Sequence, residues 1–465
     1  MSIYSIISNI YPFSSLPDLS QDYADIDKFS EIFSSNPSWK TAKKSGLYHS
    51  GFRSVHMMNT AKVLCDFFSQ LIFSEQVSIV ASNETCQKYI DDVLNKSGFW
   101  KAMPQWLSFS FALGGGALKT YAYDNKICID FVHANRFIPL AWNNNSITSG
   151  AFLSVSFHDG FFYTLIERHF YNDDGIYSIE HKLFKSKQHN SIGSEIPLEE
   201  RFPLLSPMIT INTPTPLFTY FKPAVSNNLH PYSPLGLSVF ANACDTIKAL
   251  DIAFDSFTRE FILGKKRIIV PSSCVQTVVD ITTGEQRQYF DADDEAYVAL
   301  KCDEERDLKI TDNTITLRIE DHVKAINALL NILCFQCGLS AGALSFDEIK
   351  GVRTATEILY RDNKTASAAK HNKNILTEAI EAVSHSVLYL GACIGHISHD
   401  DAANCDVTIS WHDGIVCDDN TLIENNIKLV SAGLKSRLSA VMEVLKCDEN
   451  TAKNELSKIL NEQTN

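Results

Sequence analysis

Two apolar stripes with helical spacing stand out between residues 234 and 338. In residues 237–264 the large apolar side chains recur every three or four positions: Phe240, Cys244, Ile247, Leu250, Phe254, Phe257 and Phe261. The second stripe starts near Arg318 and contains Ile319, Val323, Ile326, Leu330, Leu333 and Cys337. Each set therefore falls on one face of a helix. We predict two long helices, 237–264 and 318–337, that pack as an antiparallel hairpin with residues 266–317 at its tip.

Charged residues separate the apolar positions of the first stripe. They are Asp245, Lys248, Asp251, Asp255 and Glu260, and they predict a solvent-exposed face on this helix. Pro234 suits the first turn of the helix, and Gly264 suits its end. A hairpin of two helices leaves other apolar faces open, and a neighbouring subunit is the simplest cover for them.

The hydrophobic period changes at the glycine run 114–116. Before it we predict helices at 57–72, 84–96 and 100–113. After it, alternation with a period of two predicts strands at 118–123, 127–132, 136–141, 151–158, 161–171 and 176–184. Turn pairs such as Asp159-Gly160 separate these strands. A helical segment followed by an antiparallel meander is an α+β arrangement.

The rest of the chain is divided by prolines, glycines and polar stretches. Residues 185–233 contain seven prolines, which favours an extended connection leading to Pro234. Short β-type runs at 268–270, 275–281, 287–290 and 297–300 predict a small β-rich insert. After Gly338 a loop leads to Thr354, which forms a capping-box pattern with Glu357 and opens a helix to about residue 390. We expect one strand at 407–411 and helices at 421–432, 436–445 and 450–460.

Composition and charge restrict the classes of function. The 465 residues, 45% hydrophobic and 21% charged, are enough for two to four folded domains. A formal charge of −14 opposes tight binding of a polyanion, so contact with nucleic acid would rest on local basic groups. The twelve cysteines are scattered singly, which favours reduced thiols in a cytosolic setting. The N-terminal residues lack the basic start of a signal peptide, and no apolar run reaches the ~20 residues of a membrane span.

Three groups of residues could carry chemistry, and each has a simpler structural explanation. The glycine run before Lys119 looks like a phosphate-binding loop, but no glycine directly precedes the lysine and the order is helix then strand. Cys334 and Cys337 form a CxxC inside a helical stripe, where core packing is the simpler explanation. One dense cluster has metal-ligand types, namely His396, His399, Asp400, Asp401, Cys405 and His412. A metal-dependent hydrolase that uses this cluster is the enzymatic alternative.

Lys350 and Arg353 lie in the loop after Gly338. If this loop faces a central cavity, the two side chains could contact DNA phosphates. In an ordinary surface loop they would need no ligand. The spacing of the residues leaves both interpretations open.

Several segments of the chain, in their order, resemble the portal (head–tail connector) proteins of tailed bacteriophages, of the type found in siphophages and prophages of Gram-positive hosts. Residues 245–270 and 319–347 carry most of the resemblance, together with TATEILYRD at 354–362. LGGGALK at 113–119 and VSAGLKSRLSAVMEVL at 430–445 add to it.

The resemblance implies a ring of identical subunits, usually twelve, at one capsid vertex of the virion, assembled in the host cytoplasm. Double-stranded DNA would be packaged and ejected through its channel, and the chain itself would have no enzyme activity, cofactor or membrane contact. Its partners would be the terminase large subunit, head-completion or adaptor proteins, the major capsid protein and scaffolding protein. Another head component, such as a minor capsid or adaptor protein, is the structural alternative.

Carried onto this sequence, the portal architecture implies an assignment of regions. Residues 1–233 would be the wing, 234–265 and 318–338 the stem helices, 266–317 the clip, 339–353 the tunnel loop, 354–395 the long wing helix and 396–465 the crown-side helical region. Lys350 and Arg353 would then face DNA, and the clip would dock the terminase and the head-completion proteins. An acidic protein suits such a conduit, because tight binding at every phosphate would hold back a moving polymer.

Overall fold

The computed structural model describes residues 3–10, 18–45, 50–73, 76–144, 146–189, 191–264, 268–271, 277–279, 286–288, 297–300, 311–312, 316–346, 363–412, 419–445, 452–453 and 455–458. The chain forms two compact units, residues 1–72 with 79–409 and residues 73–78 with 410–465. Helices and mostly antiparallel sheets occur together, which confirms the α+β class. Among the helices described, none has both the length and the apolar character needed to cross a membrane.

The N-terminal part of the first unit is largely helical. Its helices are α1 (Ile3–Ile10), α2 (Ser20–Phe33), α3 (Thr60–Ile72), α4 (Glu84–Lys96) and α5 (Phe99–Leu113), and the last three lie within a few residues of their predicted positions. The aromatic helix α5 is deeply buried, with Trp106 and Phe111 both packed on Phe221. It ends at Gly114, whose φ of +82° is the left-handed conformation that favours glycine.

The predicted meander is present after this glycine. Its strands are β4 (Gly116–Tyr123), β5 (Lys126–His133), β6 (Phe137–Asn143), β7 (Ser146–His158), β8 (Phe161–Tyr171) and β9 (Tyr177–Ser186). Strands β6 to β9 pair in sequence order, and β4 pairs with β5 in a separate sheet. The expectation that 185–233 is only an extended connection is wrong. This segment adds β10 (Ser194–Ile196) and β11 (Met208–Ile211), which pair with β9, and β12 (Phe218–Phe221), which pairs with β4.

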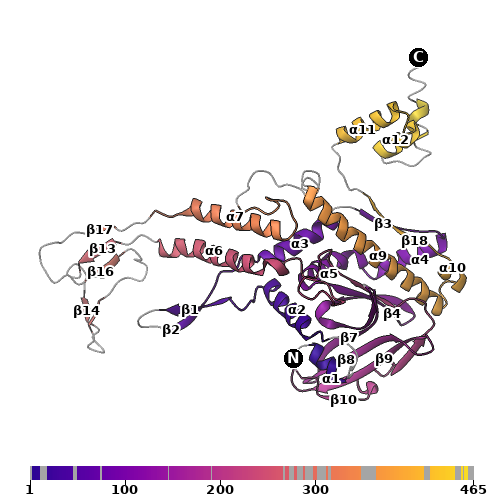
Figure 1. Ribbon diagram of the computed structural model, residues 1–465, viewed down its shortest axis with the longest axis horizontal. Coiled ribbons are helices and arrows are strands. Elements are labelled where there is room, and N and C mark those ends of the chain that lie inside the picture. The colour runs from indigo at the N-terminus through magenta and orange to yellow at the C-terminus, as the bar shows by residue number, and fades with distance from the viewer. Residues whose placement is uncertain are drawn as a thin grey trace. The chain divides into compact units, whose positions relative to one another are not determined.

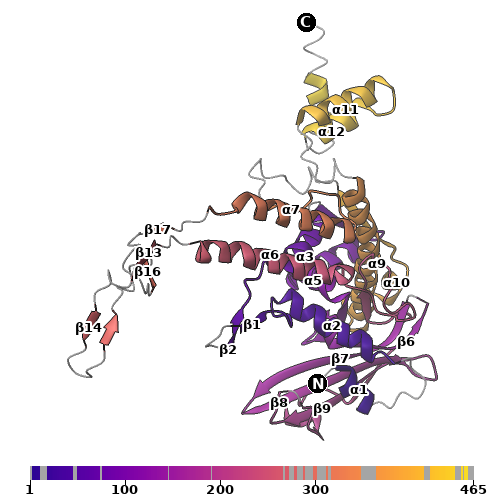
Figure 2. The ribbon, with the colours of Figure 1, turned by 60° about the vertical axis from the view of Figure 1, so that its left-hand side comes forward.

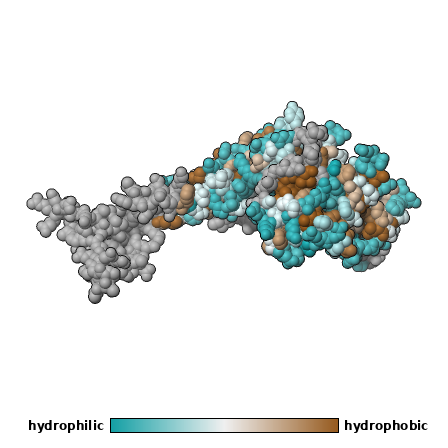
Figure 3. All heavy atoms as spheres, turned by 90° about the horizontal axis from the view of Figure 1, so that it is seen from below, coloured by the Kyte–Doolittle hydropathy of each residue, from teal (hydrophilic) through white to brown (hydrophobic). Residues whose placement is uncertain are grey.

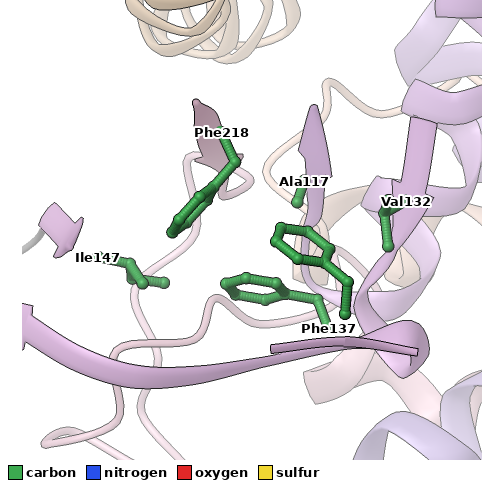
Figure 4. Close-up of a cluster of buried hydrophobic side chains, with 6 residues drawn as sticks. Ala117, Val132, Phe137, Ile147 and Phe218 are labelled. Carbon is green, nitrogen blue, oxygen red and sulfur yellow. The ribbon is translucent and has the colours of Figure 1, made fainter. Parts of the chain in front are cut away.

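An apolar core lies where the two sheets meet, and Figure 4 shows its side chains converging from strands of both. It consists of Ala117, Val132, Phe137, Ile147, Phe152 and Phe218. Phe137 is fully buried and stacks within 6 Å of Phe152, Phe218 and Tyr220, measured between ring centroids. Each large side chain buried here stabilises the fold by roughly 1.5–3 kcal/mol, so this region is complete within one subunit.

The first long helix begins later than predicted. Residues Ala241–Ala243 form a short 3-10 turn, and the α-helix proper, α6, covers Cys244–Leu263. The preceding residues are instead held against the end of α5, because the Val239 N–H donates to the Phe111 carbonyl at 3.0 Å. A Cβ atom on Gly114 would lie 2.7 Å from the Gly236 carbonyl oxygen. Tertiary contacts therefore replace the helical hydrogen bonds that were predicted for the residues between Pro234 and Cys244.

The second long helix, α7 (Ile319–Gln336), lies beside α6, and both views of the ribbon show the two as a hairpin (Figures 1 and 2). Gly338, with φ of +75°, follows its end as predicted. Between the helices the structure describes β13 (Ile268–Pro271), β14 (Thr277–Val279), β15 (Gln286–Gln288), β16 (Tyr297–Leu300) and β17 (Thr311–Asp312), the last unpredicted. The start of the next helix near Thr354 lies outside the described residues, and α9 covers Asn363–Cys393.

After α9 come α10 (His399–Ala403) and β18 (Val407–His412), which pairs with β3 (Gln76–Ala81). The strand β3 was not predicted, whereas β18 matches its predicted position. In the second unit, α11 (Asp419–Ser431) and α12 (Arg437–Leu445) pack together, and residues 452–453 and 455–458 are helical. An apolar hollow of about 750 Å³ lies between them, lined in part by Ile427, Val441 and Leu456.

Candidate assembly site at the two-helix hairpin

The hairpin of α6 and α7 is closely packed near the α6 N-terminus. There Phe240, Ile247, Ile326, Leu330 and Leu333 are at most 3% exposed. The Thr246 hydroxyl donates to Gln336 Oε1 at 2.7 Å and links the two helices at the same end. The predicted stripes thus meet each other over this half of the hairpin.

The stripes do not close over the other half. Phe261 and Ile319 are 43% and 41% exposed, and Phe254, Phe257 and Val323 are half-buried. Phe346, from the segment after α7, packs on Phe254 and Phe257 with ring centroids 6.4 and 5.9 Å apart. At this end a third segment fills part of the gap between the two helices, and some apolar surface remains open.

An ion pair joins the ends of the two helices where they meet the insert. Arg318 donates from Nε and NH2 to the carboxylate of Glu260 at 3.1 and 2.9 Å, and His322 Nε2 lies 3.7 Å from it. Hydrogen bonds from Arg318 are the main cause that lowers the pKa of Glu260 to about 2. The hairpin is thus held at this end by a carboxylate that stays charged at neutral pH.

The first residues of the predicted tunnel loop fold back along α7. The Gly342 N–H donates to Asn331 Oδ1 and the Phe346 N–H donates to Asn327 Oδ1, both at 2.8 Å. The Ser340 N–H donates to Thr365 Oγ1 of α9 at 3.1 Å. Lys350 and Arg353 themselves lie outside the described residues.

Two carboxylates of α6 have a different role from the one predicted. Asp251 and Asp255 were expected on a solvent-exposed face, but they are 1% and 4% exposed. Asp251 accepts from Trp39 Nε1 at 2.9 Å and from the Met58 N–H at 3.0 Å. Asp255 accepts hydrogen bonds from both terminal nitrogens of Arg53, at 2.8 and 2.7 Å. These aspartates anchor residues 39–58 to the long helix.

The electrostatics of the two aspartates differ. Burial raises the pKa of Asp251, and its hydrogen bonds from Trp39 and Met58 only partly offset that. Burial would also raise the pKa of Asp255, but hydrogen bonds and charge from Arg53, together with those from His56, hold it well below its usual range. Sequence reasoning missed both because a helical wheel gives spacing but not the distant segment that covers a face. One feature of the sequence did point to a partner for these aspartates, since residues 36–59 contain four Lys or Arg and no acidic residue.

Lys119 belongs to a buried network between strands β4, β8 and β9. Its Nζ lies 2.8 Å from Glu167 Oε2 and 5.1 Å from the centre of the Phe152 ring. Glu167 accepts from His169 Nε2 at 2.5 Å, and His169 Nδ1 lies 2.7 Å from Tyr177 Oη, which accepts the Leu217 N–H. The glycine run before Lys119 is therefore packed, and its lysine faces a carboxylate of the same chain.

This network fixes the protonation of the buried histidine. Because the ionised Glu167 carboxylate can only accept, His169 donates to it from Nε2. Nδ1 of the neutral ring then accepts the proton of the Tyr177 hydroxyl, whose oxygen accepts the Leu217 N–H. Burial lowers the pKa of His169. Burial would raise the pKa of Glu167, but Lys119 and His169 hold it well below its usual range.

The CxxC cysteines are packed in the interior, and His396 and Asp401 of the histidine-rich cluster make local hydrogen bonds. Cys334 is fully buried, and burial, with Cys334 and Cys244 nearby, raises the pKa of Cys337 to about 12, which makes a thiolate unfavourable. His396 lies 3.1 Å from both the Tyr89 hydroxyl and the Asn125 amide. Asp401 accepts from Ser398 and Asn83 at 2.7 Å. Throughout the part of the chain that the structure describes, no group of three or more His, Cys, Asp or Glu could hold a metal ion.

Comparison with known proteins agrees with this arrangement. A family model for phage portal proteins, SPP1 Gp6-like, matches residues 49–465. The chain therefore belongs to this family of phage portal proteins, and the hydrolase alternative has no support. A search of curated proteins finds no match.

Proposed function

We propose that this portal protein forms a closed ring at the capsid vertex of a siphophage or prophage of a Gram-positive host, with copies of the α6–α7 hairpin side by side around a channel for double-stranded DNA. One observation carries the proposal, namely the apolar surface that the hairpin leaves uncovered. Ile252 and Ile262 of α6 and Ile332 and Phe335 of α7 are between 48% and 73% exposed. Figure 3 likewise shows apolar surface on the stem helices among hydrophilic residues. Grouped exposed apolar side chains mark interaction surfaces.

The two helices offer different surfaces, and this supports a ring. An interface between the α6 surface of one copy and the α7 surface of the next is head-to-tail. Such an interface leaves one unused surface at each end of a growing assembly, and a constant rotation can bring these ends together. Closure then covers every copy of Ile252 and Phe335 equally.

The remaining regions receive partners by the same reasoning. The insert 266–317 is the clip, which docks the terminase large subunit during packaging and head-completion or adaptor proteins afterwards. The tunnel loop 339–353 faces the channel, where Lys350 and Arg353 contact DNA phosphates. Residues 354–395 are the long wing helix. The crown-side region 396–465 faces the capsid interior, and the major capsid and scaffolding proteins take part in assembly.

The charge of the chain supports a conduit that holds DNA weakly. At a net charge of −14, phosphate contacts are limited to local basic groups, and the two basic residues of the tunnel loop are such a group. The Phe346 N–H donates to Asn327 and its ring packs on Phe257, so the start of that loop is tied to the two-helix hairpin. The force for DNA movement comes from the terminase.

Negative-stain microscopy and native mass spectrometry of the purified chain test the proposal. We expect closed rings with a pore wide enough for duplex DNA. The double variant Ile252→Asp/Phe335→Asp should lose rings, whereas Leu204→Asp, a change at a 93% exposed apolar residue outside the hairpin, should keep them. A wild-type chain that stays monomeric at high concentration would contradict the proposal.

A further inference from the structure

An isolated β-hairpin lies between α2 and α3. Strands β1 (Thr41–Ser45) and β2 (Ser50–Ser54) pair antiparallel, with Thr41 opposite Ser54, and in the described part of the chain neither pairs with another strand. Figures 1 and 2 show this hairpin standing apart from the sheets, beside the stem. A lone two-stranded hairpin is marginally stable in water, so its shape needs support from elsewhere.

Among the described residues, side-chain hydrogen bonds from α6 support it at its base. Asp251 binds Trp39 before β1 and Met58 after β2, and Asp255 binds Arg53 at the end of β2. Because both carboxylates lie on one rigid helix, they fix where the hairpin leaves the stem. The base is thus held in place. Phe52, which directly precedes Arg53 and lies nearer the turn of the hairpin, is 70% exposed.

The sequence of the hairpin shows what it could bind. Residues 36–59 contain Lys40, Lys43, Lys44 and Arg53 and no acidic residue, in a chain of net charge −14. In the pairing register Lys43 is opposite the exposed Phe52. A basic segment that exposes a phenylalanine fits a surface that combines carboxylates with an apolar residue.

The start of α7 is such a surface. Ile319 is 41% exposed, and Glu320 and Asp321 beside it are exposed acids in the first turn. In both ribbon views the β1–β2 hairpin and the start of α7 lie toward the same end of the stem. They are separated within one subunit, since α6 lies between them in both views.

We infer that the β1–β2 hairpin docks onto the first turn of α7 in the adjacent copy of this chain, with Phe52 against Ile319 and the basic strand β1 beside the acidic first turn of α7. This inference rests on the ring proposed above. The hairpin then ties each subunit to the next at a second point, beyond the direct contact of the stem helices.

Photo-cross-linking tests the contact directly. p-Benzoylphenylalanine is placed at position 52 of the full-length chain, rings are checked by native mass spectrometry, and the sample is then irradiated. We expect linked dimers and higher ladders, with residue 52 joined to a peptide that contains residues 319–321. Intact rings that yield only intramolecular links, or links to another surface, would overturn the inference while leaving the ring in place. Absence of rings in the wild type would instead refute the proposed function.

Charge reversal tests the same contact without a probe. Lys43→Glu/Lys44→Glu should raise the protein concentration needed for half-assembly by about tenfold, a typical size for interface charges. Adding Glu320→Lys/Asp321→Lys should restore much of the loss, because the attraction is re-formed with opposite signs. Phe52→Asp should also weaken assembly, whereas the matched control Phe157→Asp, at a 64% exposed phenylalanine of β7, should not. Equal effects at positions 52 and 157, or no restoration, would contradict the inference.

Discussion

The core between the two β-sheets and the α6–α7 hairpin both contain large aromatic side chains, but the two regions expose them to very different extents. In the core Phe137 is fully buried among other rings. In the hairpin Phe261 and Phe335 are 43% and 73% exposed. Exposure of large apolar groups is costly, so the core is covered within this chain, whereas the hairpin leaves apolar surface that a neighbouring copy would cover in the proposed ring. The comparison separates what stabilises the subunit from what remains for assembly.

Buried charge shows the same contrast. The Lys119–Glu167–His169 network lies between strands β4, β8 and β9, and each of its groups has a partner there. The Arg53–Asp255 pair instead joins the stem to a hairpin that projects from it. Charged groups therefore complete the core in the first case and orient a projecting element in the second.

The largest effect on subunit stability should follow Lys119→Met. The change leaves the Glu167 carboxylate buried without its cation, which costs about 3–5 kcal/mol. Denaturant unfolding of the subunit measures it. The double change Lys119→Met/Glu167→Gln is the control, and it should recover part of the loss. If the single variant unfolds like the wild type, the network is not a source of stability.

A smaller loss should follow Asp255→Asn, which leaves Arg53 without a carboxylate and costs about 1.5–3 kcal/mol. The pKa of Asp255 is held below its usual range, so its contribution is present above about pH 4 and fades as the pH falls through the folded pKa. The variant should therefore lose the acid-side slope of stability that the wild type has. Asp251→Asn should cost less, because burial already raises that pKa. Equal losses in the two variants would contradict this account.

Changes on the stem surface should have almost no effect on the free subunit. Ile262→Asp replaces a 52% exposed side chain, so its free energy of unfolding should change by at most about 0.5 kcal/mol. Sedimentation should nevertheless show weaker ring formation. Unfolding as severe as that of Lys119→Met would place Ile262 in the core and remove the contrast between the two regions.

The smallest effect on folding and assembly should come from Lys350→Glu/Arg353→Glu. Rings should form as in the wild type, while DNA packaging falls because the channel loses two phosphate contacts and gains two negative charges. Packaging assays with matched Lys88→Glu virions serve as the control, since Lys88 lies exposed on α4. Normal packaging by the double variant would refute the role of this loop.

The sequence predicted those helices and strands whose local hydrophobic pattern is enough to determine their type and position. Amphipathic spacing located α7 and α4, and alternation located β8 to the residue. Distant contacts decided the rest. The start of α6 moved to Cys244 because Val239 bonds to Phe111, more than a hundred residues earlier. The strand β1, TAKKS, has no apolar alternation to reveal it.

The site was predictable only in part, for the same reason. Spacing identified the apolar residues of the hairpin, but exposure depends on what covers each face, and Phe346 could not be foreseen as a cover for Phe257. The acidic residues of α6 look alike in sequence. Only the fold separates Asp255, which binds Arg53, from Asp245 of the same helix.

The close approach of Gly114 and Gly236 fixes how the segment before α6 leaves the end of α5. No side chain separates the two backbones, and a Cβ on Gly114 would push the segment that leads into α6 away from the end of α5. Such a wedge would tilt the stem slightly relative to the rest of its own subunit. In the ring proposed above, such a tilt would be repeated in every subunit, so the contact between these two glycines would fix the direction in which each copy presents its hairpin to the next.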